Sequence, residues 1–302
     1  MTSSNAATAP TGLSASERVQ VAHVNGIALH YVDSGNGPTV FLLHGGMGDL
    51  WAWPHQIRAL TPRYRVVAYS RRRSHPNQNE DTRCRCFANC IDEDIDDLLA
   101  LQTELHAGPV HLLGTSYGAL LALAVALRTP DRVASLMLAE PPLHRWACAT
   151  QYGERLYRAF IAGVWSAAAD AFRHGLQHRA MQLLIDGMWG RPIFGSWPDE
   201  RVEAVMRNAD AMQALTQAKD PFPEVDRCAV ASLTKPTLLL QGEQNSALHR
   251  QVMSELGNVM PDATRTDIAS AGHGLPNDNP DDFNSAVVAF LESLRHSKGD
   301  SR

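Results

Sequence analysis

The segment Val110–Gly118, with the sequence VHLLGTSYG, decides the fold of this chain. Its apolar first half is typical of a strand, and it runs into Gly-x-Ser-x-Gly followed by a long apolar helix pattern over residues 119–127. A strand that turns into a helix within one residue forces Ser116 into a strained backbone conformation, and the flanking glycines let the two backbones pack closely. Ser116 then stands at a helix N-terminus, where N–H groups and the helix dipole favour negative charge. We therefore expect Ser116 to be a nucleophile; the alternative is a tight turn whose serine only caps the helix.

Strand patterns alternate with helix patterns on both sides of this segment. Continuous apolar runs indicate strands buried on both faces, and their alternation with amphipathic stretches indicates a parallel sheet covered by helices. Near the N-terminus, two alternating runs joined by Asn25-Gly26 indicate a tight hairpin. The expected fold is α/β, with a doubly wound and mostly parallel sheet. The expected strands cover residues 18–23, 27–32, 39–43, 64–69, 110–113, 133–139, 236–240 and 264–268, and the expected core helices cover 53–60, 91–105, 119–127, 247–256 and 280–294.

Between Glu140 and about Ala231 the alternation stops and helix patterns alone remain, over residues 152–169, 171–186 and 198–218. This insertion is rich in large apolar residues. We expect most of them to pack between helices and some to line a substrate cavity against the main domain. The candidates for the cavity wall are Met47, Trp165, Trp189 and Phe194. The expected domains are a disordered tail over 1–16, an α/β core over 17–140 and 232–296, a helical cap over 141–231, and a solvated tail over 297–302.

Composition and charge disfavour several classes of partner. The chain has 302 residues, of which 44% are hydrophobic and 20% charged, and its formal net charge is −5 without a long basic run. This disfavours nucleic acid and acidic membrane surfaces as partners. No apolar run reaches about 18 residues, so we expect no membrane span. The first residues lack the basic and apolar parts of a signal peptide, so we expect a cytoplasmic protein; a homodimer is compatible with this composition.

Three of the five cysteines, Cys84, Cys86 and Cys90, cluster as C-x-C-x3-C, which is a pattern to weigh as a metal site. Structural zinc sites pair such ligands with a second set at characteristic spacing, and none follows here. We therefore expect free thiols in a reducing compartment, and neither a metal nor another cofactor.

A serine hydroxyl is a weak nucleophile at neutral pH, so it needs a base, and the base needs an acid to orient it. Among 13 histidines, His273 is the strongest candidate for the base. It follows the last expected strand in a glycine-flanked loop, which places it at the same edge of the sheet as Ser116. His44 adjoins a glycine pair, and we expect it to hold that loop by hydrogen bonds.

Together these features resemble the α/β-hydrolase family. The resemblance rests on the strand order, on the motifs His44–Gly46, Gly114–Gly118 and Gly272-His273, and on the helical insertion, and it covers about residues 19–294. The family implies an eight-stranded, mostly parallel sheet with a helical lid.

The family also implies an oxyanion hole made by the backbone N–H groups of Gly46 and of Tyr117, the residue after the nucleophile. The loop after the fourth strand departs from the common Asp-x-Arg-Gly-x-Gly pattern of the family. It reads SRRRSH from Ser70 to His75, with Arg72 in the place of the usual arginine. The contacts beside the oxyanion hole are therefore not given by the resemblance. We expect His75 at the surface, with the pocket wall as the alternative.

The acid of the triad also departs from the common pattern. In most members an Asp follows the first strand after the lid, and the aligned residue here is Asn245, which has no charge to stabilise an imidazolium. A subset of the family, including haloalkane dehalogenases and zearalenone-lactone hydrolases, resembles another arrangement, with a Glu at the end of the strand after the nucleophile's helix. Glu140 stands at that position, and it keeps the nucleophile–acid–base order of the family. We expect Glu140 to be the acid, with Glu243 as the alternative.

The alternative for Glu140 is a purely structural role, in a salt bridge to an arginine such as Arg72 or Arg145.

The expected reaction is acyl transfer to water, with a bulky hydrophobic ester or lactone as the small-molecule substrate. A serine nucleophile disfavours haloalkane dehalogenase and epoxide hydrolase chemistry, which use an Asp at this place. The alternatives that the residues leave open are a C–C bond hydrolase acting on a diketone, a cofactor-free lyase or oxygenase in which His273 is the working base, and a non-catalytic member that binds a ligand.

Overall fold

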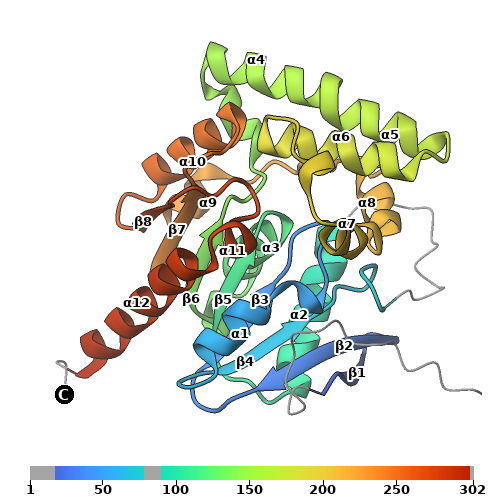
Figure 1. The fold of residues 1–302 in the computed structure, drawn as a ribbon. Helices are drawn as coiled ribbons and strands as arrows, with labels where there is room; N and C mark the ends of the chain where they lie inside the picture. Colours follow the sequence, from blue (N-terminus) through green and yellow to red (C-terminus); the bar gives the residue numbers. More distant parts are fainter. Residues whose placement is uncertain (1–17, 78–89, 300–302) are drawn as a thin grey trace, which may run out of the picture.

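The computed structural model describes residues 18–77 and 90–299, and its centre is one eight-stranded sheet (Figure 1). The strand order is β1-β2-β4-β3-β5-β6-β7-β8; β2 pairs antiparallel with β1 and β4, and the other pairs are parallel. This confirms the doubly wound, mostly parallel, eight-stranded α/β-hydrolase sheet that was expected. The strands are β1 (Gln20–Val24), β2 (Ile27–Ser34), β3 (Thr39–Leu43), β4 (Arg65–Tyr69), β5 (Val110–Thr115), β6 (Val133–Ala139), β7 (Thr237–Gly242) and β8 (Thr264–Ile268).

Helices cover both faces of this sheet because its parallel strands are apolar on both sides. In β3, Val40 and Leu42 belong to the core cluster that α1 and α12 complete, whereas Phe41 and Leu43 belong to the cluster on the side of α2, α3 and α10. Each such side chain contributes roughly 1.5–3 kcal/mol when it is fully buried. The core helices are α1 (Pro54–Leu60), α2 (Cys90–Glu104), α3 (Tyr117–Arg128), α10 (Ala247–Val259), α11 (Leu275–Asp278) and α12 (Pro280–Gly299).

The order of the strands creates a switch point between β3 and β5. The chain moves outward from β3 to β4, crosses back through α2, and continues outward from β5 in the other direction. Loops at the carboxyl ends of β3 and β5 therefore diverge and leave a crevice, where ligands bind in open α/β sheets. Between β1 and β2 the expected hairpin is present, and Asn25 and Gly26 take the positive φ angles of 50° and 76° that this tight turn needs.

The segment between β6 and β7 is helical and lies over the carboxyl ends of the strands (Figure 1). Two side-chain contacts fasten it to the core: the Asn208 amide donates to Asp49 at 3.0 Å, and Arg201 pairs with Asp278 at 2.7 Å. The helices are α4 (Gln151–Phe160), α5 (Ser166–Arg173), α6 (Gln177–Trp189), α7 (Asp199–Met206), α8 (Ala209–Thr216) and α9 (Arg227–Ala231). The domain boundaries at 140 and 232 stay a prediction.

The helix boundaries in this insertion differ from those expected. A π-helical stretch at Ile161–Trp165 joins α4 to α5, so the first helical region continues to Arg173. The second expected helix begins six residues late, because Gly175, with φ of 73°, turns the chain between α5 and α6. The third is broken into α7 and α8.

The chain ends also bear on earlier expectations. The last helix runs to Gly299, so the C-terminal tail does not begin at Ser297 as expected. The expected N-terminal tail lies outside the described residues, as do Cys84 and Cys86, and only the backbone of Cys90 is described. Within 18–77 and 90–299, no helix has the length and apolarity that crossing a membrane requires.

The turn from β5 into α3 depends on Gly118. A Cβ at this position would lie 1.9 Å from the backbone oxygen of Leu43, in the centre of the sheet where neither backbone can move away. We expect Gly118→Ala to lower the free energy of unfolding by about 3 kcal/mol or more, despite the higher helix propensity of alanine. Urea unfolding measures this change.

Gly108→Ala is the matched control, since a Cβ there has no neighbour within 4 Å. It should leave the urea midpoint unchanged or slightly higher. Equal midpoints for Gly118→Ala and the wild type would show that the strand–helix contact is not as close as described.

Candidate active site

Ser116 occupies the sharp turn between β5 and α3 with φ of 50° and ψ of −121°, an uncommon conformation for a residue with a side chain. Its backbone N–H donates to Ala139 of β6 at 2.7 Å, which ties the turn to the neighbouring strand. The Ser116 side chain makes no capping hydrogen bond to the helix that it precedes. It lines a cavity instead, so the reading of Ser116 as a simple helix cap has no support in the geometry.

His273 and Glu140 form a close buried pair. The Nδ1 atom of His273 lies 2.6 Å from Oε2 of Glu140, and the second carboxylate oxygen accepts the backbone N–H of Gly242 at 2.7 Å. Both side chains are almost fully buried. Glu140 directly follows β6 and itself has φ of 52°, while His273 comes from the loop after β8. The Nε2 atom of His273 has no hydrogen-bond partner among the described residues, and His273 lines the same cavity as Ser116.

The other candidate for the acid, Glu243, is not part of this buried pair. Glu243 is exposed and accepts the backbone N–H of Ser270. Asn245, at the position where most family members carry the Asp, is buried but uncharged. The structural salt bridge considered for Glu140 is not formed with either arginine, because Arg72 pairs with Asp97 and Arg145 pairs with Asp220. The roles of Ser116, Glu140 and His273 remain predictions that this geometry permits.

Burial controls the protonation of this pair. Desolvation raises the pKa of Glu140 to about 7 and lowers the pKa of His273 to about 4. The two groups share a hydrogen bond, so their ionisations belong to the pair and not to either residue alone. The last proton therefore leaves the pair near neutral pH.

A second buried histidine, His249, stacks on His273 with ring centroids 4.3 Å apart. Its Nδ1 atom lies 2.8 Å from the hydroxyl of Ser246, and burial together with the charge of His273 lowers its pKa to about 3. Potential ligand atoms of Glu140, His249 and His273 lie within 4.8 Å of one another. A metal ion would have to replace the His273–Glu140 hydrogen bond, so the arrangement favours an acid–base pair over a metal site.

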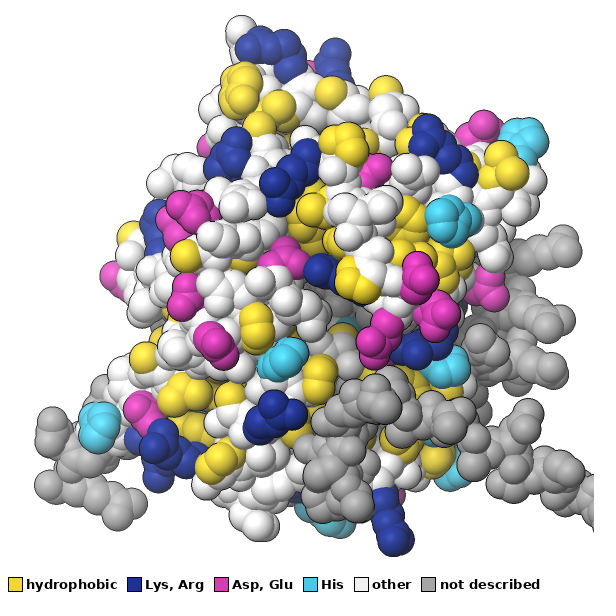
Figure 2. All heavy atoms as spheres, in the orientation of Figure 1, with side chains coloured by type: hydrophobic (Ala, Val, Ile, Leu, Met, Phe, Trp, Pro, Cys, Tyr) yellow, Lys and Arg dark blue, Asp and Glu magenta, His cyan; other side chains and the backbone are white. Residues whose placement is uncertain are grey.

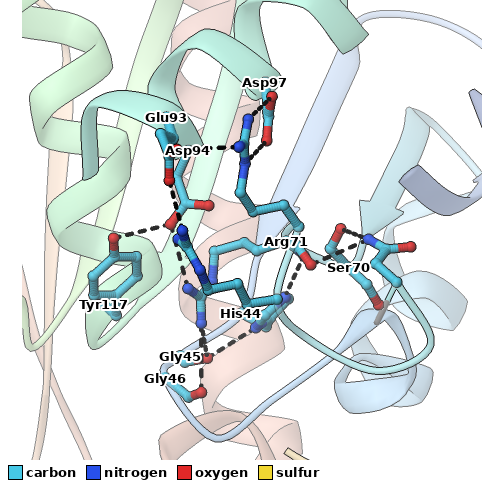
Figure 3. A network of polar contacts seen from close by, with 12 residues as sticks. His44, Gly45, Gly46, Ser70, Arg71, Glu93, Asp94, Asp97 and Tyr117 are labelled. Atoms are coloured by element: carbon cyan, nitrogen blue, oxygen red, sulfur yellow. Dashed lines mark hydrogen bonds and ion pairs between the residues drawn. The ribbon is translucent and has the colours of Figure 1, made fainter. Parts of the chain in front are cut away.

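A buried network lies behind the loop that follows β3 (Figure 3). The Arg71 guanidinium donates to the backbone oxygens of Gly45 and Gly46 at 3.2 and 3.4 Å, and it lies 4.4 Å from the centre of the Tyr117 ring. Asp94, from α2, accepts the Tyr117 hydroxyl at 2.9 Å and pairs with Arg71 at 3.4 Å. The two residues expected to form the oxyanion hole, Gly46 and Tyr117, are thereby tied to one ion pair.

His44 holds the same loop, as expected. The backbone N–H of Arg71 donates to Nε2 of His44 at 3.1 Å, so this nitrogen carries no proton, and Nδ1 donates to the Gly45 oxygen at 2.8 Å. Burial and the charge of Arg71 hold the pKa of His44 well below its usual value. His44 is therefore a neutral structural residue and not a competing base.

The cavity has a volume of about 530 Å³, within the range of small-molecule sites. Of the four residues expected on its wall, Met47, Trp165 and Trp189 line it. Phe194 does not: it packs with Ile185 and Trp189 and against the His178 ring. In the view of Figure 2, hydrophobic side chains gather where α6 and α7 lie in Figure 1. His75 is half-buried against Trp51 and is not part of the wall.

Comparison with known proteins identifies the family of this chain. The family model for the alpha/beta hydrolase fold matches residues 38–280. This chain belongs to the α/β-hydrolase fold family. The carboxylesterase YbfK of Bacillus subtilis is 26% identical over 272 residues, which are 87% of this chain and 83% of the relative. Epoxide hydrolase 3 of Mus musculus is 26% identical over 284 residues, which are 89% of this chain and 75% of the relative.

A solved structure with the same fold is the enol-lactonase from Burkholderia xenovorans LB400. It aligns with a TM-score of 0.68 at 21% identity and covers 90% of this chain and 100% of its own. These similarities identify the chain as a member of a hydrolase family. The relatives are named for the hydrolysis of different types of bond, so their names do not specify the bond that this chain cleaves.

Several site residues were missed from the sequence. Arg71 lies in the loop Ser70 to His75 at a position that the family pattern leaves open, and Asp94 lies in a run of acidic residues without a motif. His249 and His144 lie at the cavity without any motif around them. The run of three arginines at residues 71–73, facing the acidic start of α2, was the one signal in the sequence that indicated an ion-pair network.

We expect Arg71→Met to destabilise the protein by about 3–5 kcal/mol, because it leaves the buried carboxylate of Asp94 without its cation. Burial already raises the pKa of Asp94, which shows how little solvent compensates its charge. Urea unfolding at neutral pH measures the loss. The double variant Arg71→Met/Asp94→Leu should recover part of it, since both charges are gone.

Arg128→Met serves as the control. Arg128, at the end of α3, pairs at 2.7 Å with Asp96, which lies on α2 like Asp94. The side chains of Arg128 and Asp96 are 48% and 53% exposed. Removal of Arg128 should cost at most about 1 kcal/mol. Equal costs for the two arginines would rule out a buried anchor at Arg71.

Proposed function

We propose that this protein is a serine hydrolase that cleaves a carboxylic ester or lactone of a bulky hydrophobic substrate. The observation that carries the proposal is the arrangement around one cavity. Ser116 stands there on a strained turn without a capping role, and His273 has Nδ1 bonded to Glu140 at 2.6 Å and Nε2 unbonded. This is the arrangement that a serine nucleophile, its base and an orienting acid require.

In the proposed first step, Nε2 of His273 takes the proton of the Ser116 hydroxyl while the serine oxygen attacks the substrate carbonyl. The negative charge moves to the carbonyl oxygen, which the backbone N–H groups of Gly46 and Tyr117 stabilise. Collapse of this intermediate breaks the carbonyl–oxygen bond, and the imidazolium gives its proton to the leaving alkoxide. A water molecule, deprotonated by His273, then hydrolyses the acyl-enzyme and restores Ser116.

In this proposal Glu140 acts on the base through its hydrogen bond to Nδ1 of His273. Because the carboxylate accepts from Nδ1–H, the neutral imidazole keeps its lone pair on Nε2, where the serine proton must go. The same carboxylate stabilises the imidazolium that forms in each step. Gly242 supports it by donating to the other oxygen.

The cavity supports the choice of substrate class. Its wall is mainly aromatic and aliphatic, and a volume of about 530 Å³ accommodates a molecule larger than a short-chain ester. The names carboxylesterase and enol-lactonase among the relatives agree with hydrolysis at a carbonyl carbon.

Labelling with a fluorophosphonate tests the nucleophile. The reagent should bind covalently to Ser116 at one equivalent per chain, and Ser116→Ala should abolish both labelling and hydrolysis of p-nitrophenyl butyrate, by about 10⁶-fold in kcat. Intact mass and peptide mass spectrometry locate the label. Ser232→Ala, at an exposed serine outside the cavity, should leave both unchanged.

An unlabelled Ser116 together with retained ester hydrolysis would contradict the serine mechanism. An unlabelled Ser116 without any ester hydrolysis would favour the lyase, oxygenase or ligand-binding alternatives.

The pH dependence follows from the state of the pair. The working form has Glu140 ionised and His273 neutral, and burial raises the pKa of Glu140 to about 7, so the pair gains a proton below that pH. We expect kcat/KM to be constant above about pH 7 and to fall tenfold per pH unit below it. Initial rates between pH 5 and 9, in buffers of constant ionic strength, measure the profile.

Glu140→Gln should lower the plateau by about 10³–10⁴-fold. It should also move the fall in rate to lower pH, because burial lowers the pKa of the remaining base, His273. Glu243→Gln should change neither property, since Glu243 is exposed and bonded to Ser270. A Glu140→Gln variant with normal turnover and an unchanged profile would exclude Glu140 as the acid.

A further inference from the structure

His144 is a buried imidazole on the cavity wall that none of the described residues satisfies. It begins the 3-10 turn His144–Ala149, four residues after Glu140, and only 2% of it is exposed. Both of its ring nitrogens lack a hydrogen-bond partner among residues 18–77 and 90–299. The catalytic mechanism proposed above does not use it.

The surroundings of His144 are aromatic. Its ring centroid lies 4.8 Å from that of Phe160, 4.6 Å from that of Phe222 and 5.3 Å from that of His249. Burial keeps the pKa of His144 well below its usual value, so the ring is neutral at physiological pH. A neutral imidazole carries one N–H donor and one acceptor, and a buried donor without a partner costs free energy.

Trp165 is a second buried side chain whose N–H the described residues leave unsatisfied, and like His144 it contacts the ring of Phe222. Its indole lies 4.5 Å from Phe222, its N–H has no partner among the described residues, and it lines the same cavity as His144. By contrast, the N–H of the nearby Trp146 donates to the backbone oxygen of Val225 at 3.0 Å. The fold thus satisfies the indole of Trp146, whereas the cavity wall carries buried donors without a partner in the described part of the chain: those of Trp51 and Trp53, and, together beside Phe222, those of His144 and Trp165.

We propose that His144 and Trp165 form a polar subsite that binds an uncharged oxygen acceptor, such as a keto oxygen, carried by an otherwise hydrophobic ester substrate. The proposal rests on the serine hydrolase function proposed above, because the same cavity holds Ser116 and His273. One oxygen with two lone pairs can accept from both ring N–H groups. His144 is neutral, which disfavours a carboxylate, because the arginines that line the cavity, Arg201 and Arg207, already pair with Asp278 and Asp49.

A matched pair of substrates tests this subsite. The kcat/KM values of p-nitrophenyl 5-oxoheptanoate and 6-oxoheptanoate are compared with that of p-nitrophenyl heptanoate, after subtraction of the uncatalysed rates. The wild type should prefer at least one oxo ester by about tenfold or more, which is the factor expected for one recovered hydrogen bond. His144→Leu should remove this preference, so that the variant hydrolyses the oxo esters and the plain ester with equal kcat/KM values.

Three further variants separate hydrogen bonding from packing. His144→Gln, which keeps a donor, should restore part of the preference, and Trp165→Phe should reduce it. Phe160→Leu, which changes the packing around His144 but removes no polar group, should alter the rates with all three esters by the same factor. Urea unfolding without substrate should show His144→Leu to be as stable as the wild type or more stable, because it removes an unsatisfied buried group.

The results that overturn the proposal are distinct from those that overturn the hydrolase function. Equal rates with oxo and plain esters in the wild type, or a loss of stability with parallel loss of all rates in His144→Leu, would make His144 a packing residue only. If the wild type hydrolyses none of the esters, the hydrolase proposal fails. In that case calorimetric titration with 2-heptanone, with and without the His144→Leu change, decides on the subsite alone: weaker binding in the variant supports it, and equal or no binding refutes it.

Discussion

The hydrogen bond between His273 and Glu140 requires the loop that bears His273 to cross the carboxyl end of the neighbouring strand. Glu140 follows β6 and His273 comes from the loop after β8, so the pair spans the carboxyl end of β7 between them. That strand ends in Gly242, where a Cβ would lie 2.5 Å from the backbone oxygen of Gly272. Because Gly242 lacks a side chain, the histidine loop can cross it, and its N–H is left to donate to Glu140. One glycine therefore permits the contact and also orients the carboxylate.

The fold was predictable because several levels of the sequence agree on it. The apolar runs, the glycine pair around Ser116 and the Asn25-Gly26 turn each favour the element that is present, and the sheet order follows from βαβ connections of one hand. The expectation that Glu140 partners His273 used the position of Glu140 at the end of a strand. Neighbouring parallel strands end at the same edge of a sheet, so the backbone position of such a residue is predictable even where the loop conformations are not.

What could not be predicted depends on side chains whose partners are distant in the sequence. Asn208 separates α7 from α8, and its amide bonds to Asp49 and to the backbone of His75, contacts that no local pattern encodes. Phe194 was expected at the cavity because it is large and apolar, but size does not tell which side of a cap helix faces the cavity. Arg71 donates to the backbone oxygens of Gly45 and Gly46 from a loop position at which the family pattern specifies no residue. Local pattern thus placed the backbone elements, and tertiary contacts decided the side-chain roles.

The stacked histidines bear on where charge forms during the proposed reaction. His249 and His273 are both buried and 4.3 Å apart, so two positive charges on them would repel strongly in a medium of low polarity. The pKa of His249 is about 3, lowered by burial and by His273, and Ser246 already occupies its Nδ1 atom. The Glu140 carboxylate is bonded to His273, so its stabilisation acts most strongly there. In the proposed reaction we therefore expect the proton from Ser116 to remain on Nε2 of His273, from which the leaving group recovers it, and not to pass to His249.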